Sequence, residues 1–193
     1  MAECLDAIAQ GITNDCTKQP VRGLVKKAWI GLVGDFAETP DGTNANLITA
    51  IANSSGKQFY PVNAYRQDID AGFDLVVSEN LPEKYAHYFK VEPWDENADQ
   101  VNNLDGMNKI VAIVEREGGS LKDSGDGAFQ IYGLQHGLYK SSATFRANDN
   151  EGVPVYEFIS REGQQESHSK YVFFDTDYAT TLAAVVALET PGV

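Results

Sequence analysis

The sequence has 193 residues, of which 42% are hydrophobic and 22% charged, with 15 lysines and arginines against 28 aspartates and glutamates. That length and composition predict one globular domain with a buried core. The net charge of −13 disfavours contact with nucleic-acid phosphates, and no basic stripe reverses it locally, so sequence-specific DNA or RNA binding is a poor hypothesis. A negative surface can still serve nucleic acid by lining a conduit through which it slides without sticking.

The sequence gives no sign of a membrane or export signal. No apolar run approaches the roughly 18 residues needed to span a bilayer. The first residues include acids where a secretory signal carries lysine or arginine, which predicts synthesis in the cytosol. Cys4 and Cys16 are too few for a disulfide framework, so free thiols are expected and a bridge between them is the alternative.

The first half of the chain predicts an arm followed by a β-rich domain over residues 23–193. Residues 1–22 form either an arm ordered by contact with something else or a frayed terminus. Strands are expected over 23–33, near 47–51 and over 57–62, where Pro61 indicates an edge or an end of a strand.

Residues 69–93 predict a long hairpin with an unusual amount of apolar surface. Two strand-like segments, 71–78 and 84–91, are separated by a short polar connection. Such a ribbon carries more apolar surface than a two-stranded hairpin should leave in water, so it folds back on the core or pairs with a neighbouring subunit. As assembly residues we expect Phe73, Leu75, Val77, Tyr85, Tyr88 and Phe89.

The second half predicts a short helix within 94–106 and an antiparallel meander over 108–162. The meander segments are 109–115, 128–132, 138–145 and 153–160, joined by turns rich in Gly, Asn and Asp. A strand over 170–174 then leads to a helix over 179–188, capped by Thr176 or Asp177. That helix should bury Leu182, Val185 and Val186.

The search for catalytic or metal-binding patterns finds none. His87, His136 and His168 lie in different segments and share no metal-ligand spacing with other ligands. There is no Gly-x-Ser-x-Gly elbow, and the acidic segments 123–127 and 149–152 do not match an EF-hand loop. We therefore expect no catalytic residue, no metal ligand and no cofactor site, and an assembly protein rather than an enzyme.

Several segments resemble the tail-tube family of tailed bacteriophages, in particular the virion tube or ring proteins of the Bacteroides-group phages. The resemblance is carried by 3–16 (ECLDAIAQGITNDC), 109–114 (KIVAIV), 129–139 (FQIYGLQHGLY) and 173–182 (FFDTDYATTL). It spans most of the chain in loose patterns. The absence of a clear central helix leaves open a related ring or connector component.

The resemblance implies a mainly β fold, an antiparallel β-sandwich or barrel with one or two short helices and a long hairpin. Subunits of the family form hexameric rings that stack into a tube, with the hairpin and terminal arms bridging successive rings. The implied partners are other copies of the chain, other tail proteins and genomic DNA passing through the lumen. The implied location is the virion tail, after synthesis in the host bacterial cytoplasm.

A second hypothesis comes from a different class. A monomeric β-sandwich could bind carbohydrate through exposed Trp94 and tyrosines, with calcium held by the acidic loops. Ring formation by the purified protein would favour the first hypothesis, and calcium-dependent glycan binding by a monomer would favour the second.

Overall fold

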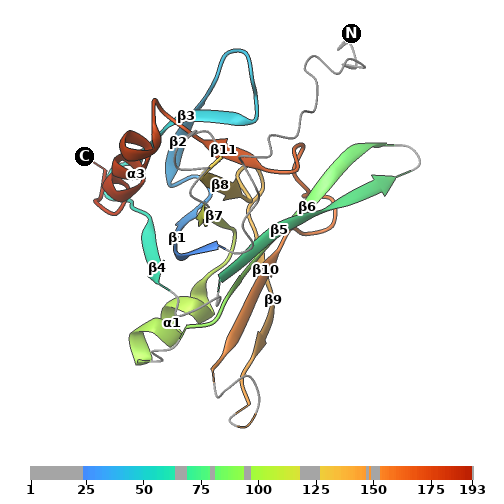
Figure 1. The fold of residues 1–193 in the computed structure, drawn as a ribbon. Helices are drawn as coiled ribbons and strands as arrows, with labels where there is room; N and C mark the ends of the chain where they lie inside the picture. Colours follow the sequence, from blue (N-terminus) through green and yellow to red (C-terminus); the bar gives the residue numbers. More distant parts are fainter. Residues whose placement is uncertain are drawn as a thin grey trace.

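The computed structural model describes residues 24–63, 69–78, 81–93, 97–117, 127–146, 148 and 153–192. This part of the chain is mainly β, with two sheets that do not close into a barrel, which confirms the expected sandwich-like class (Figure 1). Two helices accompany the sheets in the described residues, α1 (Ala98–Gly106) and α3 (Tyr178–Ala187). The expected arm at 1–22 lies outside the described residues.

The larger sheet has seven strands in the order β2-β3-β11-β8-β7-β1-β4. Its pairs are antiparallel except β11 with β3, which run parallel and depart from the purely antiparallel expectation. The interior strand β7 begins with five apolar residues that are buried on both faces, as a strand covered from both sides requires. The strands are β1 (Leu24–Leu32), β2 (Phe36–Pro40), β3 (Leu47–Asn53), β4 (Tyr60–Asn63), β7 (Ile110–Arg116), β8 (Phe129–Tyr132) and β11 (Tyr171–Phe173).

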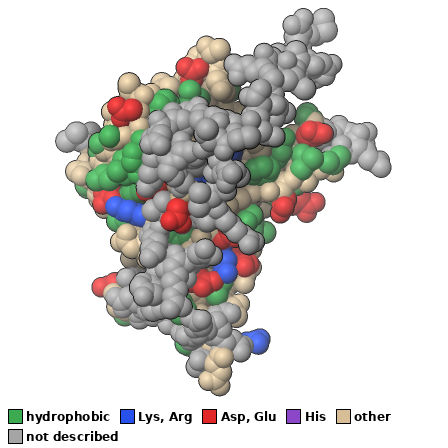
Figure 2. All heavy atoms as spheres, viewed as in Figure 1, with side chains coloured by type: hydrophobic (Ala, Val, Ile, Leu, Met, Phe, Trp, Pro, Cys, Tyr) green, Lys and Arg blue, Asp and Glu red, His purple; other side chains and the backbone are tan. Residues whose placement is uncertain are grey.

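The smaller sheet has four strands in the order β5-β6-β10-β9 and is antiparallel throughout. Its strands are β5 (Ile69–Ser78), β6 (Leu81–Val91), β9 (Tyr139–Thr144) and β10 (Val155–Ile159). β5 and β6 form the expected long hairpin, about 33 Å from end to end at the rise of an extended strand. The hairpin stands out from the body of the molecule, with hydrophobic side chains along it at the right of the view (Figure 2).

The predicted meander over 108–162 is wrong in its connectivity. β7 pairs with β8 in the large sheet and β9 pairs with β10 in the small sheet, while β8 and β9 lie in different sheets. The segment Gly133 to Gly137 moves the chain between them. Gly133 has φ 75°, and a Cβ there would lie 2.7 Å from Cγ of Leu138, so this turn needs glycine both for its conformation and for its space.

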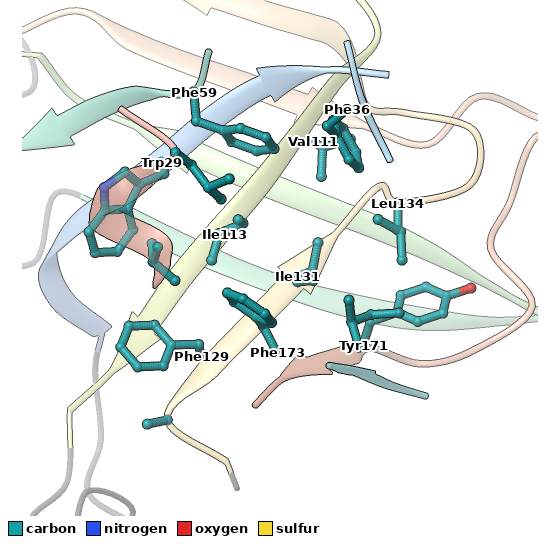
Figure 3. Close-up of a cluster of buried hydrophobic side chains, with 14 residues drawn as sticks. Trp29, Phe36, Phe59, Val111, Ile113, Phe129, Ile131, Leu134, Tyr171 and Phe173 are labelled. Carbon is teal, nitrogen blue, oxygen red and sulfur yellow. The ribbon is translucent and has the colours of Figure 1, made fainter. Parts of the chain in front are cut away.

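The large sheet buries a hydrophobic cluster on each face. The first cluster lies between the sheet and α3 and contains large aromatic side chains from several strands (Figure 3). The second lies between the two sheets, with Leu104 of α1 at its margin. Along β7 the side chains alternate between the clusters: Val111 and Ile113 join the first, and Ile110, Ala112 and Val114 join the second. The three layers are therefore α3, the large sheet and the small sheet.

α3 begins as predicted and differs from the prediction on one face. Asp177 is the N-cap, because its carboxylate accepts a hydrogen bond of 2.7 Å from the backbone N–H of Thr180. Val185 is buried against the sheet, whereas Val186 is 43% exposed and Thr181 takes the buried position instead. The Thr181 hydroxyl donates to the Asp177 carbonyl, which satisfies its polar atom in the core.

Candidate functional site

The β5–β6 hairpin carries one apolar face from the core out into solvent. At its base, Ile69 and Ala71 of β5 pair with Val91 and Phe89 of β6, and these side chains belong to the cluster between the sheets. Since alternate residues of a strand lie on the same face, the following odd-numbered residues continue this face beyond the core.

The continuation forms what we call the apolar ridge: Phe73, Leu75 and Val77 of β5 together with Tyr85 of β6. The first three are 42%, 50% and 71% exposed, rising toward the tip of the hairpin. The rings of Phe73 and Tyr85 meet edge to face with their centroids 5.7 Å apart. The ridge is therefore an ordered apolar surface rather than a set of scattered side chains.

Two of the expected assembly residues lie elsewhere. Phe89 is completely buried in the core of the protomer, so it is not available for contact with another molecule. Tyr88 lies on the opposite, outer face, where its hydroxyl is 3.4 Å from the Asp70 carboxylate. Partial burial, followed by the nearby Asp70 carboxylate, raises the Tyr88 pKa. Gly72 makes room for this ring, because a Cβ there would lie 2.7 Å from Cε1 of Tyr88.

The charged side chains on the outer face of the small sheet come close to balance, and the 44% exposed Ile159 lies among them. The pairing places Asp70, Asp74, Lys84, Lys90 and Glu157 on the face opposite the core. Three carboxylates and two lysines leave this face with little net charge. The strong negative charge of the chain is therefore not concentrated on the described part of this surface.

Both edges of the small sheet are open in the described part of the chain. β5 and β9 are its terminal strands, and each has one neighbour in the sheet. An open strand edge presents backbone N–H and C=O groups that can pair with another strand. The hairpin thus combines an apolar face with an available backbone edge.

A buried histidine fixes the base of the hairpin. His87 of β6 is fully buried; its Nε2 donates to the His168 carbonyl at 2.9 Å, and its Nδ1 accepts from the Gly133 backbone N–H at 3.1 Å. We assign the neutral Nε2–H tautomer because only that form satisfies both contacts. Burial lowers the pKa of His87 from 6.5 to about 4. The His87 and Ser160 backbones add two hydrogen bonds beside the ring, to the Ser160 hydroxyl and the His87 carbonyl.

A buried glutamate holds the neighbouring turn. The Glu166 carboxylate accepts hydrogen bonds of 3.0 Å from the backbone N–H groups of both Gln135 and His136. The Glu166 backbone exchanges two hydrogen bonds of 2.9 Å with that of Tyr85. Burial raises the pKa of Glu166, and the two hydrogen bonds oppose that rise.

We call His87, Ser160, Glu166 and the 133–137 turn the polar clamp. It joins the hairpin, the crossover between sheets and the 160–168 loop at the point where the hairpin leaves the core. Sequence reasoning missed it because its members come from three segments that are far apart in the sequence. A histidine in a strand and a glutamate in a polar loop carry no pattern that marks them as neighbours.

The other expectations about chemistry concern residues in different parts of the chain. In the described ranges, no group of three or more His, Cys, Asp or Glu side chains could hold a metal ion. Trp94 and the acidic segments 123–126 and 149–151 lie outside the described residues. No helix in the described part is both long and apolar enough to cross a membrane.

The candidate site is therefore an exposed apolar surface, the apolar ridge, held by the polar clamp. Comparison with protein-family models, curated proteins and solved structures finds no match for this chain.

Proposed function

We propose that this protein is a structural virion protein that assembles into rings, which stack into a bacteriophage tail tube or tail ring conducting the DNA genome. The observation that carries the proposal is the apolar ridge, which continues the core face of the small sheet into solvent. The resemblance of several segments to the tail-tube family supplies the virion context and the expectation of six subunits per ring.

The ridge is suited to contact with another protein. Phe73, Leu75 and Val77 are each at least two-fifths exposed on one ordered surface. Burying an apolar side chain of this size is favourable by about 1.5–3 kcal/mol, and the exposed part of each of these can still gain a share of that. A neighbouring subunit that covers the ridge would gain this free energy of burial, whereas in an isolated protomer the apolar surface stays in contact with water.

The open edges of the small sheet support assembly of copies around an axis. β5 and β9 lie at opposite ends of the same sheet, so a contact between them on two copies joins different surfaces of each protomer. Such head-to-tail contacts build closed rings or open filaments, depending on the rotation between copies. Each ring would thereby remove the exposed edges that make a lone sheet prone to aggregation.

The charge balance fits a conduit for DNA. The net charge of −13 opposes tight binding of phosphates, and the outer face of the small sheet carries acids and lysines in near balance. DNA would pass such a surface without sequence-specific binding. Other tail proteins would meet the ends of the tube.

Sedimentation velocity of the purified chain tests self-assembly against the monomeric alternative. We expect a protein that forms large species of discrete size as concentration rises, without calcium or glycan. A monomer at all concentrations that binds glycans only with calcium would overturn the proposal and support a carbohydrate-binding module.

A further inference from the structure

The hairpin leaves the core at His87, whose two ring nitrogens are both hydrogen-bonded. Tyr85, two residues from His87 toward the tip of the hairpin, is held by two backbone hydrogen bonds to Glu166. Further along, the hairpin has only its own ladder and the Phe73–Tyr85 ring contact between described residues of β5 and β6. The direction of the apolar ridge is therefore set by the polar clamp.

We propose that His87 is an acid-sensitive positioning residue, which holds the β5–β6 hairpin in its projecting direction while its ring is neutral and releases it when the ring takes up a proton. The link to assembly rests on the proposed function, because the hairpin carries the ridge. The conformational step itself concerns the single protomer.

The ring can hold the clamp only in its neutral form. Nδ1 of His87 accepts from the Gly133 N–H, while Nε2 donates to the carbonyl of His168. A proton added to Nδ1 would place two N–H donors against each other, so the Gly133 contact would be replaced by repulsion. The backbone of β8 and that of β6 would then lose the side chain that joins them.

The direction of the pH effect follows from the pKa of His87. Burial lowers it to about 4 in the closed clamp, whereas a released, solvated histidine has the ordinary value of 6.5. The released form therefore binds the proton more tightly, and the closed form is favoured above pH 6.5. Below pH 6.5, each pH unit lowers the equilibrium constant of the closed over the released form about tenfold, until the ring protonates within the closed clamp. The total decrease in this constant is roughly two orders of magnitude.

Glu166 acts in the opposite sense. Burial raises its pKa in the closed clamp above the ordinary 4.5, so the closed form binds this proton more tightly than the released form does. Its contribution favours the closed form below pH 4.5 and is lost as pH rises through the folded-state pKa. Glu166 therefore opposes acid release and is not its trigger.

The other titratable groups around the clamp come from the adjoining elements. The Tyr132 ring of β8 lies 5.3 Å from that of His87, and burial raises the Tyr132 pKa to about 12, so it stays neutral across this range. Tyr171 of β11 likewise has its pKa raised to about 12 by burial. His168 supplies its carbonyl, and burial lowers its pKa. His136 is exposed and lies beside Glu166, where it favours the ionised form of the Glu166 carboxyl group.

Residue-resolved hydrogen–deuterium exchange of the dilute full chain between pH 7 and 4 tests the proposal. The readout is the protection factor, which divides out the intrinsic pH dependence of exchange. We expect the amides of Gly133 and Tyr85 to lose protection progressively below pH 6.5, by up to about a hundredfold, while those of Ile113 and Ile131 in the large sheet stay protected.

His87→Asn is the informative variant, because its side-chain oxygen can accept from Gly133 but cannot take up a proton in this range. It should remove the pH dependence at Gly133 and Tyr85. His136→Asn removes the exposed histidine of the same turn, which favours the ionised form of Glu166, so it should change only the Glu166 contribution and keep the loss of protection that begins below pH 6.5.

Three results would overturn the proposal. They are pH-independent protection in the wild type, an unchanged pH profile in His87→Asn, and loss of protection at Ile113 and Ile131 in step with Tyr85, which would mean unfolding of the whole domain. Electron microscopy of the concentrated protein at pH 7 keeps this test separate from the proposed function. Absence of rings there contradicts assembly, while the exchange data decide on the clamp.

Discussion

Phe73 and Phe89 lie on the same face of one hairpin, and their environments differ completely. Phe89 is fully buried between the two sheets, with its ring centroid 6.4 Å from that of Phe158, while Phe73 is 42% exposed on the apolar ridge. Substitutions at the two residues therefore distinguish effects on stability from effects on assembly, although the sequence alone places both among the expected assembly residues.

Truncating the two phenylalanines should give opposite results. Phe89→Ala opens a cavity in the core and should lower the free energy of unfolding by about 3–5 kcal/mol. Phe73→Ala removes a half-exposed ring and should cost less than about 1 kcal/mol, yet weaken self-association. Urea unfolding and sedimentation velocity on both variants measure the two effects. An equal loss of stability in both would show that Phe73 is a core residue.

At the scale of single elements, the hairpin, the edge strand β4 and the capped helix α3 were predictable because local patterns specify them. Pro61 indicates an edge strand, and β4 is the last strand of its sheet. No strand is predicted at β2, because only Phe36 of that strand is buried and the other four residues are exposed. Their strand conformation comes from pairing with β3, which a local pattern does not report.

The predicted meander over 108–162 was wrong for a related reason. A turn with Gly133 and Gly137 reads as a hairpin connection, but here it carries the chain from one sheet to the other. Which sheet a strand joins depends on distant partners, and the turn residues alone do not specify them. The polar clamp was missed for the same cause, because His87 and Glu166 come together only once both sheets have formed.

The contact between α3 and β1 depends on Glu189 just past the helix end. Its carboxylate accepts hydrogen bonds of 2.8 Å from Nε1 of the buried Trp29 and from Nζ of Lys27. Glu189→Ala leaves the indole N–H unsatisfied and should cost about 1–3 kcal/mol in urea unfolding. Glu189→Gln keeps an oxygen acceptor for Trp29 and should cost about 1 kcal/mol or less, the value of a partly exposed ion pair with Lys27. Equal losses would show that the charge matters more than the indole hydrogen bond.

The hairpin as an element is tested by placing a charge on the apolar ridge. Leu75→Asp should abolish assembly, because a carboxylate cannot be buried against a neighbour without a partner, while stability changes by about 0.5 kcal/mol or less. Leu32→Asp is the matched control, since Leu32 is 43% exposed against 50% for Leu75 but lies at the end of β1. Sedimentation velocity compares them at equal concentration. Loss of assembly in both variants would point to net charge rather than to the ridge.

At the scale of the whole molecule, three features support the proposed assembly. The small sheet has two open edges, its core face extends into an exposed ridge, and a polar clamp fixes the direction of that ridge. The open edges leave backbone groups without a neighbouring strand and the ridge leaves apolar surface exposed in the described protomer, and contact between copies would cover both. A binding module for a small ligand needs neither an open sheet edge nor a projecting apolar hairpin.

Electron microscopy of the purified wild-type chain at neutral pH tests this account most directly. We predict rings of uniform diameter, or tubes of stacked rings with a constant axial repeat, and their absence in the Leu75→Asp variant. Monodisperse single protomers at every concentration, or rings that persist unchanged in Leu75→Asp, would contradict the claim that the hairpin drives assembly.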